Sequence, residues 1–199
     1  MNTTTIPKQE FYDRIAKFQA NIKSTGLDAC LVHATESDMA NVRYLSEYWP
    51  VFESAAIFVP ASGESVLLVG PESDIYGAQR SVFKNIEKMI EYRESAEPEC
   101  PGMKFATYKD IVSKYAPDGK IGKLGIVGWA ITTLPVYMSL KKQFPDVELI
   151  KADHTLLPLR FVKSENELDC MRKAYQISEL AIEAILDEIR PGMTELQVV

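Results

Sequence analysis

The sequence predicts an α/β fold in which a mixed β-sheet is flanked by helices on both faces. Two observations lead to this prediction. Stretches whose apolar residues recur every three or four positions alternate with short apolar runs, as expected for helices that cover a sheet. One pair of β-rich runs, 55–59 and 65–69, is joined by residues 60–64, whose proline and glycine are typical of a hairpin connection.

The first helix is predicted over residues 7–24, because Phe11, Ile15, Phe18 and Ile22 form one apolar stripe at helical spacing. A proline at its start and a glycine just past its end suit the two helix termini. The next expected elements are a short buried strand over 27–33 and one or two helical turns over 39–44.

After the hairpin, the pattern continues to alternate between helix and strand. An acidic, proline-rich run over 94–102 is expected to be a surface loop. Six strands are expected in total, in an order that the sequence leaves open. The remaining elements are helices over 71–80, 105–115 and 132–144, and strands over 86–92, 124–127 and 147–150.

The end of the chain carries two helix-start signals. Residues 164–167 (Ser-Glu-Asn-Glu) form a capping box that opens a long helix, which 190–192 (Arg-Pro-Gly) stops. A second box, at 194–197 (Thr-Glu-Leu-Gln), stands just before Val199. We expect a truncated second domain over 159–199 after a first domain over 1–158, because the long helix has an apolar seam that needs cover; a frayed natural terminus is the alternative. The seam consists of Leu168, Met171, Tyr175, Ser178, Ile182, Ile185 and Ile189.

Composition excludes several classes of protein. Among the 199 residues, 46% are hydrophobic and 25% are charged, with a net charge of −6, which fits a globular core and not a disordered tail. No basic cluster offers a face for nucleic acid. No apolar run approaches the length of a membrane span, and no signal peptide is apparent, so a cytoplasmic location is expected. Three widely spaced cysteines, Cys30, Cys100 and Cys170, fit a reducing compartment.

Four short segments form a series along the chain. They are Gly26-Leu27-Asp28-Ala29, Asn41-Val42-Arg43-Tyr44-Leu45-Ser46, Leu159-Arg160-Phe161-Val162-Lys163-Ser164-Glu165-Asn166-Glu167 and Ile189-Arg190-Pro191-Gly192-Met193-Thr194-Glu195. In this order they resemble the "GlDa", "NxxYlsG", "LRxxKSxxE" and "i-rpGmtE" motifs of creatinases, Xaa-Pro aminopeptidases and prolidases. Glu47 stands where this family commonly has glycine, which puts the path of the following loop in question, because glycine permits backbone conformations that Glu does not.

The resemblance implies a creatinase-like N-terminal domain with an RNase H-like mixed sheet, followed by the first helix of a truncated pita-bread catalytic domain. Family members hold two divalent metal ions (Mn, Co or Zn) on two Asp, one His and two Glu. All of these lie beyond residue 199, so no catalytic or metal-binding residue is assigned in this chain and the chain alone is expected to be inactive. The leading interpretation is the non-catalytic domain of an Xaa-Pro aminopeptidase or dipeptidase. The alternatives are a creatinase-type amidinohydrolase and a stand-alone interaction module.

The aromatic loop at 48–53 is the candidate functional surface. In proteins that this sequence resembles, the N-terminal domain of one subunit helps to close the active site of its neighbour. A homodimer or higher homo-oligomer acting on proline-containing peptides is therefore expected. Trp49 and Phe52 would line the substrate pocket in trans, and Arg43 or Glu53 would offer charge. The alternative is that these rings pack in the core or in a dimer interface. We expect Asn41 and Tyr44, which precede the loop, to hold it in place.

Two further patterns favour structural roles. His33 and His154 are interpreted as a strand-end and a helix-start histidine rather than as metal ligands. The glycines at 122, 125 and 128, with Glu148 about twenty residues further on, suggest a dinucleotide loop, but their G-x-x-G-x-x-G spacing fits that motif poorly. Tight packing and strand turns explain these glycines better.

Overall fold

The computed structural model of the protein describes residues 5–198. Its internal contacts divide the chain into two units. One unit comprises residues 8–161, and the other is formed by the segments before and after it. The first unit contains the whole sheet.

The sheet has six strands in the order β4-β3-β2-β1-β5-β6. Only β2 runs antiparallel to its neighbours, and the other pairs are parallel, so the predicted mixed sheet is confirmed. The carboxyl ends of five strands and the start of β2 consequently share one edge. The strands are β1 (Ala29–Ala34), β2 (Ala55–Pro60), β3 (Val66–Val69), β4 (Ile86–Lys88), β5 (Lys123–Val127) and β6 (Glu148–Lys151).

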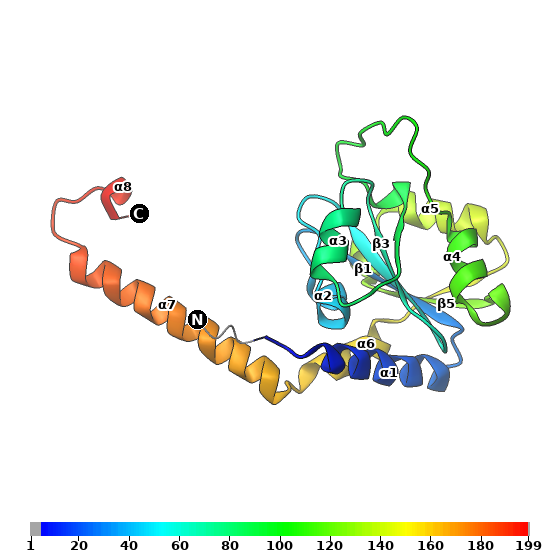
Figure 1. The fold of residues 1–199 in the computed structure, drawn as a ribbon, viewed down its shortest axis with the longest axis horizontal. Coiled ribbons are helices and arrows are strands. Elements are labelled where there is room, and N and C mark those ends of the chain that lie inside the picture. The colour runs from blue at the N-terminus through cyan, green and yellow to red at the C-terminus, as the bar shows by residue number, and fades with distance from the viewer. Residues whose placement is uncertain (1–4, 199) are drawn as a thin grey trace. The chain divides into compact units, whose positions relative to one another are not determined.

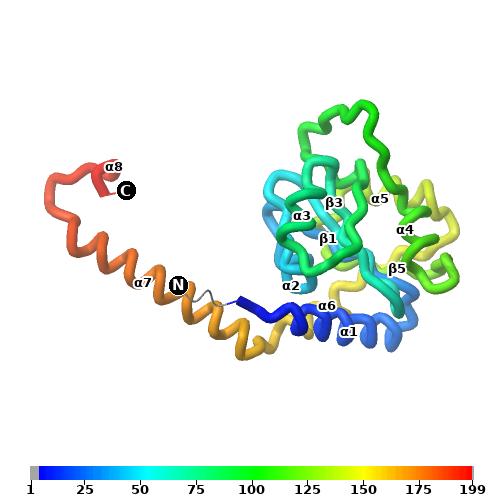
Figure 2. The backbone as a smooth tube through the Cα atoms, viewed as in Figure 1, coloured from blue at the N-terminus to red at the C-terminus, as the bar shows by residue number. Residues whose placement is uncertain are grey.

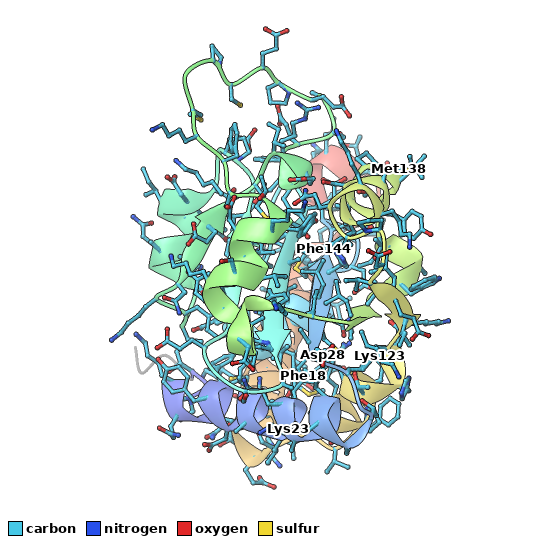
Figure 3. The ribbon with its side chains drawn as sticks, turned by 90° about the vertical axis from the view of Figure 1, so that its right-hand side faces the viewer. Phe18, Lys23, Asp28, Lys123, Met138 and Phe144 are labelled. Atoms are coloured by element: carbon cyan, nitrogen blue, oxygen red, sulfur yellow. The ribbon has the colours of Figure 1, made fainter. Side chains whose placement is uncertain are left out.

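One face of the sheet is covered by α1 (Lys8–Ser24), α2 (Ala40–Ser46), α3 (Asp74–Arg80) and α6 (Asp153–Phe161). The four apolar residues that predicted the first helix are all buried. Figure 3 places Phe18 on the side of α1 that faces the sheet, whereas Lys23 is exposed. Helices α1 and α6 lie side by side (Figure 2), and the Asn21 side-chain amide donates to the Thr155 carbonyl at 2.9 Å.

The opposite face is covered by α4 (Tyr108–Tyr115) and α5 (Leu134–Gln143). The strand predicted over 86–92 is wrong in its second half, because β4 ends at Lys88 and a 3₁₀ turn (Ile90–Tyr92) follows. That turn buries the Tyr92 side chain completely and brings its hydroxyl within 2.9 Å of the Tyr108 hydroxyl. Burying a large aromatic side chain in the core favours the turn over continued pairing at the edge of the sheet.

The other expected boundaries are confirmed within a few residues. Helix α4 begins later than predicted because Thr107 and Asp110 form a capping box that fixes its start. The sequence indicated α6 only as a helix start at His154, since Pro158 lies inside the helix and is a helix-breaking residue. Short 3₁₀ turns at Pro117–Gly119 and Trp129–Ile131 flank β5, and residues 94–102 form the expected loop (Figure 1).

The second unit contains α7 (Glu165–Glu188) and α8 (Glu195–Val198). The predicted capping box is present: the Glu167 N–H donates to the Ser164 hydroxyl at 3.1 Å, and the Ser164 N–H donates to the Glu167 carboxylate at 3.0 Å. No side chain of α7 is buried, and every residue of its apolar seam except the half-buried Leu168 is exposed. Within residues 5–198, no helix is both long enough and apolar enough to cross a membrane.

Candidate functional site

The loop between α2 and β2 starts with a sharp turn at Glu47. This residue has φ 66 and ends α2 in the left-handed conformation, while its N–H donates to the Arg43 carbonyl at 2.9 Å. Glycine would adopt this conformation without steric cost, and Glu adopts it here instead. The left-handed turn therefore forms in this chain without glycine.

The end of the loop, just before β2, is anchored by Glu53, which is buried. Its carboxylate accepts hydrogen bonds from the Tyr48 hydroxyl at 2.7 Å, the Ser73 hydroxyl at 2.6 Å and the Phe52 N–H at 3.1 Å. Burial alone would raise the pKa of this carboxyl, but these hydrogen bonds outweigh burial and lower the pKa of Glu53 below its ordinary value. The charge of Glu53 is thus used to tie the loop to the start of α3.

Trp49 lies half-buried beside two exposed arginines. The guanidinium carbons of Arg43, from α2, and Arg80, from the end of α3, are each 4.5 Å from the centroid of the indole ring. The Tyr76 ring meets the indole edge-on, with a centroid distance of 6.5 Å. Side chains from two helices, α2 and α3, therefore converge on one aromatic side chain of the loop.

The Phe52 side chain takes no part in these contacts, and 72% of its surface is exposed. It forms an apolar wall of a groove of about 460 Å³ at the carboxyl edge of the sheet. Residues from 35–36, 52–54, 90–97 and 133–135 line the groove, and its charged side chains are mostly Glu. Crevices outside the carboxyl ends of strands are the usual ligand sites of open α/β sheets.

Asn41 and Tyr44, which were expected to hold the loop, make hydrogen bonds to α6 instead. The Arg160 guanidinium donates to the Asn41 side-chain oxygen at 2.6 Å, and the Tyr44 hydroxyl donates to the Leu159 carbonyl at 2.8 Å. These bonds join the "NxxYl" segment to the "LR" pair that begins the junction motif. Two of the recognised sequence motifs are therefore in direct contact across the fold.

The structure separates the four predicted pocket residues into two groups. Phe52 and Glu53 line the groove, whereas Arg43 and Trp49 do not. The Trp49 ring instead contacts both Arg43 and Arg80. Sequence reasoning missed Arg80 and Ser73, because both contact the loop from α3 or its start and no local pattern marks them. Arg160 was part of a quoted motif, but nothing in that motif indicated Asn41 as its partner.

No metal centre is present in the described part of the chain, because no three His, Cys, Asp or Glu side chains there converge into a group that could hold an ion. His33 is buried in β1, and burial lowers its pKa to about 3, so the ring is neutral. His154 is exposed at the start of α6. The metal ions expected of the family therefore find no fitting set of ligands within residues 5–198.

The glycines around β5 have structural roles. A Cβ at Gly125 would come within 2.6 Å of the Cys30 sulfur and 2.8 Å of Ala152, so only glycine fits between these residues. Gly128 has φ +82, and its N–H donates to the Asp153 carboxylate at 2.8 Å. Close packing and a strand-end turn thus explain Gly125 and Gly128, as predicted from the sequence.

Comparison with known proteins places this geometry in a family. Residues 14–162 match the model described as the creatinase/prolidase N-terminal domain. The chain is 26% identical over 188 residues to an Xaa-Pro dipeptidase of Pyrococcus horikoshii, covering 94% of this chain and 45% of that protein. It is 21% identical over 198 residues to a creatinase of a Bacillus species, covering 98% of this chain and 44% of that protein.

A solved structure shares the fold. The prolidase from Pyrococcus horikoshii matches with a TM-score of 0.67 at 22% identity, over 94% of this chain and 46% of that one. This chain therefore spans about half the length of the relatives that it matches.

Proposed function

The chain belongs to the creatinase/prolidase N-terminal domain family, and from this premise we propose that it is the non-catalytic N-terminal part of a dinuclear-metal hydrolase. Its proposed substrates are Xaa-Pro peptides, cleaved by an aminopeptidase or dipeptidase activity. The observation that carries the proposal is the family match over residues 14–162, together with the similarity to an Xaa-Pro dipeptidase. The two metal ions (Mn, Co or Zn) would be held by residues outside this chain, because no ligand set exists in its described part.

The proposed role of this domain is to shape substrate access, in trans, at the active site of a neighbouring subunit. Its support is the contrast within one loop between a fixed base and an exposed tip. Glu53 is buried and accepts three hydrogen bonds, whereas Phe52 beside it is largely exposed over the groove. A rigid loop can present an aromatic side chain at low entropic cost on binding. In this proposal Phe52 and Trp49 contact substrate, Arg43 supplies charge and Glu53 holds the loop.

The direct test is hydrolysis by the full-length protein, supplemented with manganese, of Xaa-Pro dipeptides, longer Xaa-Pro peptides and creatine. The present 199-residue chain runs beside it as a control. Turnover of a proline substrate by the full-length protein alone is the expected result. Inactivity on the proline substrates would remove the proposed activity, and turnover of creatine only would favour an amidinohydrolase, for which the creatinase relative is the supporting observation.

The loop's role is tested with neighbouring substitutions in the full-length protein. Phe52→Ala should lower kcat/KM on the order of tenfold, the effect of losing about 1.4 kcal/mol of contact. Val51→Ala is the matched control, since Val51 is also exposed on the same loop. Equal kcat/KM for both variants and the parent would contradict a substrate contact by Phe52. Trp49→Ala with unchanged efficiency would likewise exclude Trp49.

Homo-oligomer formation is also proposed, supported by the exposed apolar seam of α7. Ile182 and Ile185 of this seam are 57% and 43% exposed, and contiguous apolar surface of this kind marks association sites. The isolated chain should therefore associate in sedimentation equilibrium, and Ile182→Ser should weaken that association. Ile75→Ser on α3, where Ile75 is 70% exposed, is the control. A monomer at high concentration would contradict the proposal.

A further inference from the structure

Two positive charges meet on one indole ring in the first unit. The guanidinium carbons of Arg43 and Arg80 are each 4.5 Å from the Trp49 centroid, so they are at most twice that distance apart. Both arginines are exposed. Among residues 5–198, no carboxylate pairs with either guanidinium, and neither side chain donates a hydrogen bond to another protein group.

Local effects explain why each arginine lies where it does. Arg43 and Arg80 occupy the last turns of α2 and α3, where the helix dipole favours positive charge. The indole face attracts each guanidinium as well. Neither effect explains why no counter-charge accompanies the pair, since acidic residues outnumber basic ones by 28 to 22 in this sequence. Arg93, by contrast, pairs with Glu97 at 2.9 Å.

We propose that Arg43, Trp49 and Arg80 form a binding site for a free carboxylate on a small ligand. Each guanidinium presents a planar set of N–H donors that matches a carboxylate in a bidentate arrangement, and the protein leaves those donors unused. The indole ring positions both guanidiniums.

The ligand class deepens the proposed function and rests on it. If the full-length protein cleaves Xaa-Pro peptides, this site would recognise the free carboxylate of a short substrate. The site would then favour dipeptides over amidated or longer peptides. Arg80, which lies on α3 outside the loop, would be a specificity-determining residue that the loop sequence alone does not reveal.

Binding can be measured on the isolated chain without any hydrolysis. The sequence has two tryptophans, so Trp129→Phe leaves Trp49 as the only indole reporter. Titration with N-acetylproline, in buffer of constant ionic strength, should change its fluorescence in a saturable way. N-acetylprolinamide, which lacks only the charge, should give no saturable change. Arg80→Met should weaken N-acetylproline binding at least tenfold, whereas Arg172→Met, which removes an arginine of α7 that pairs with Asp169, should not alter it.

Several results would overturn the site. These are equal responses to the acid and the amide, the same response to sodium chloride, or unchanged binding in Arg80→Met. If N-acetylproline acted only by dissociating a dimer in sedimentation equilibrium, the site would hold a protein carboxylate from a second copy, and the assignment to a small ligand would fail. The two proposals fail separately. Binding without proline-peptide turnover by the full-length protein would remove the proposed activity alone, and turnover without binding would remove this site alone.

Discussion

Arg14 and the pair formed by Arg43 and Arg80 make the same kind of contact, a guanidinium over an aromatic ring, in different surroundings. All three guanidiniums lie over aromatic rings, and that of Arg14 is 4.2 Å from the Tyr44 centroid. Arg14 is buried on α1, where it pairs with Glu10 and donates to the Tyr44 carbonyl at 2.8 Å. Burial of a charge requires such partners, whereas exposed charges can leave their donors to water or to a ligand. The comparison therefore separates a charge that stabilises the fold from charges that are available for binding.

The largest effect expected from this comparison is on Arg14. Arg14→Met should lower the free energy of unfolding by about 3 kcal/mol, because removing one partner of a buried ion pair leaves the other without compensation. Urea denaturation of the isolated chain measures this value. Arg43→Met serves as the control and should change stability little. Similar losses in the two variants would mean that the aromatic contact, and not burial, determines the contribution of each arginine.

The second effect concerns Glu53 and extends the comparison to a buried anion. Glu53→Gln should cost about 2 kcal/mol at pH 7, since an amide cannot accept all of the charge-assisted hydrogen bonds that the carboxylate accepts. Val51→Ala on the same loop is a control with little expected loss. An unchanged unfolding midpoint in Glu53→Gln would show that these hydrogen bonds do not stabilise the loop.

The contribution of Glu53 to the free energy of unfolding should decrease as the pH falls. Its pKa in the folded protein is lowered below the ordinary value of 4.5, so the unfolded chain binds the proton more readily. The stabilisation is therefore fully present above about pH 4.5 and decreases as the pH falls through the folded-state pKa. The difference in stability between the parent and Glu53→Gln should shrink along this acid range. A constant difference would contradict the lowered pKa.

A smaller effect is expected where α2 meets α6. Tyr44→Phe removes the hydroxyl that donates to the Leu159 carbonyl and should cost about 1 kcal/mol, the usual contribution of one hydrogen bond. Tyr12→Phe is a suitable control, since its hydroxyl makes a longer bond of 3.3 Å to the Val82 carbonyl. Greater loss in Tyr12→Phe than in Tyr44→Phe would contradict this ranking.

Local patterns in the sequence predicted most of the fold. The spacing of Phe11, Ile15, Phe18 and Ile22 predicted which face of α1 is buried, and it did so correctly. The same spacing also places Arg14 on that face, with Glu10 four residues before it, which is the signal that could have identified the buried pair. Apolar periodicity was used to find the core, and a charged residue within the stripe was therefore overlooked.

The site was less predictable, because its contacts depend on the order of elements around the sheet. The loop at 48–53 could be selected from its aromatic residues alone. Its contact with Arg80 could not, since that contact requires α3 to pack beside the end of α2. The bond between Asn41 and Arg160 likewise joins residues that are far apart in sequence. Motifs showed that these segments matter, but only the three-dimensional fold shows that they touch.

The smallest effect on stability is expected for Arg80→Met, at less than about 0.5 kcal/mol. Loss of an exposed cation–π contact is offset in part by relief of repulsion from Arg43. A ligand should make the two proteins differ, because it stabilises only a folded state that binds it. At ten times its Kd, N-acetylproline should raise the parent's stability by about 1.4 kcal/mol and leave Arg80→Met nearly unchanged. Equal stabilisation of both proteins in urea would mean that the ligand acts elsewhere, and the contrast with Arg14 would then be one of burial alone.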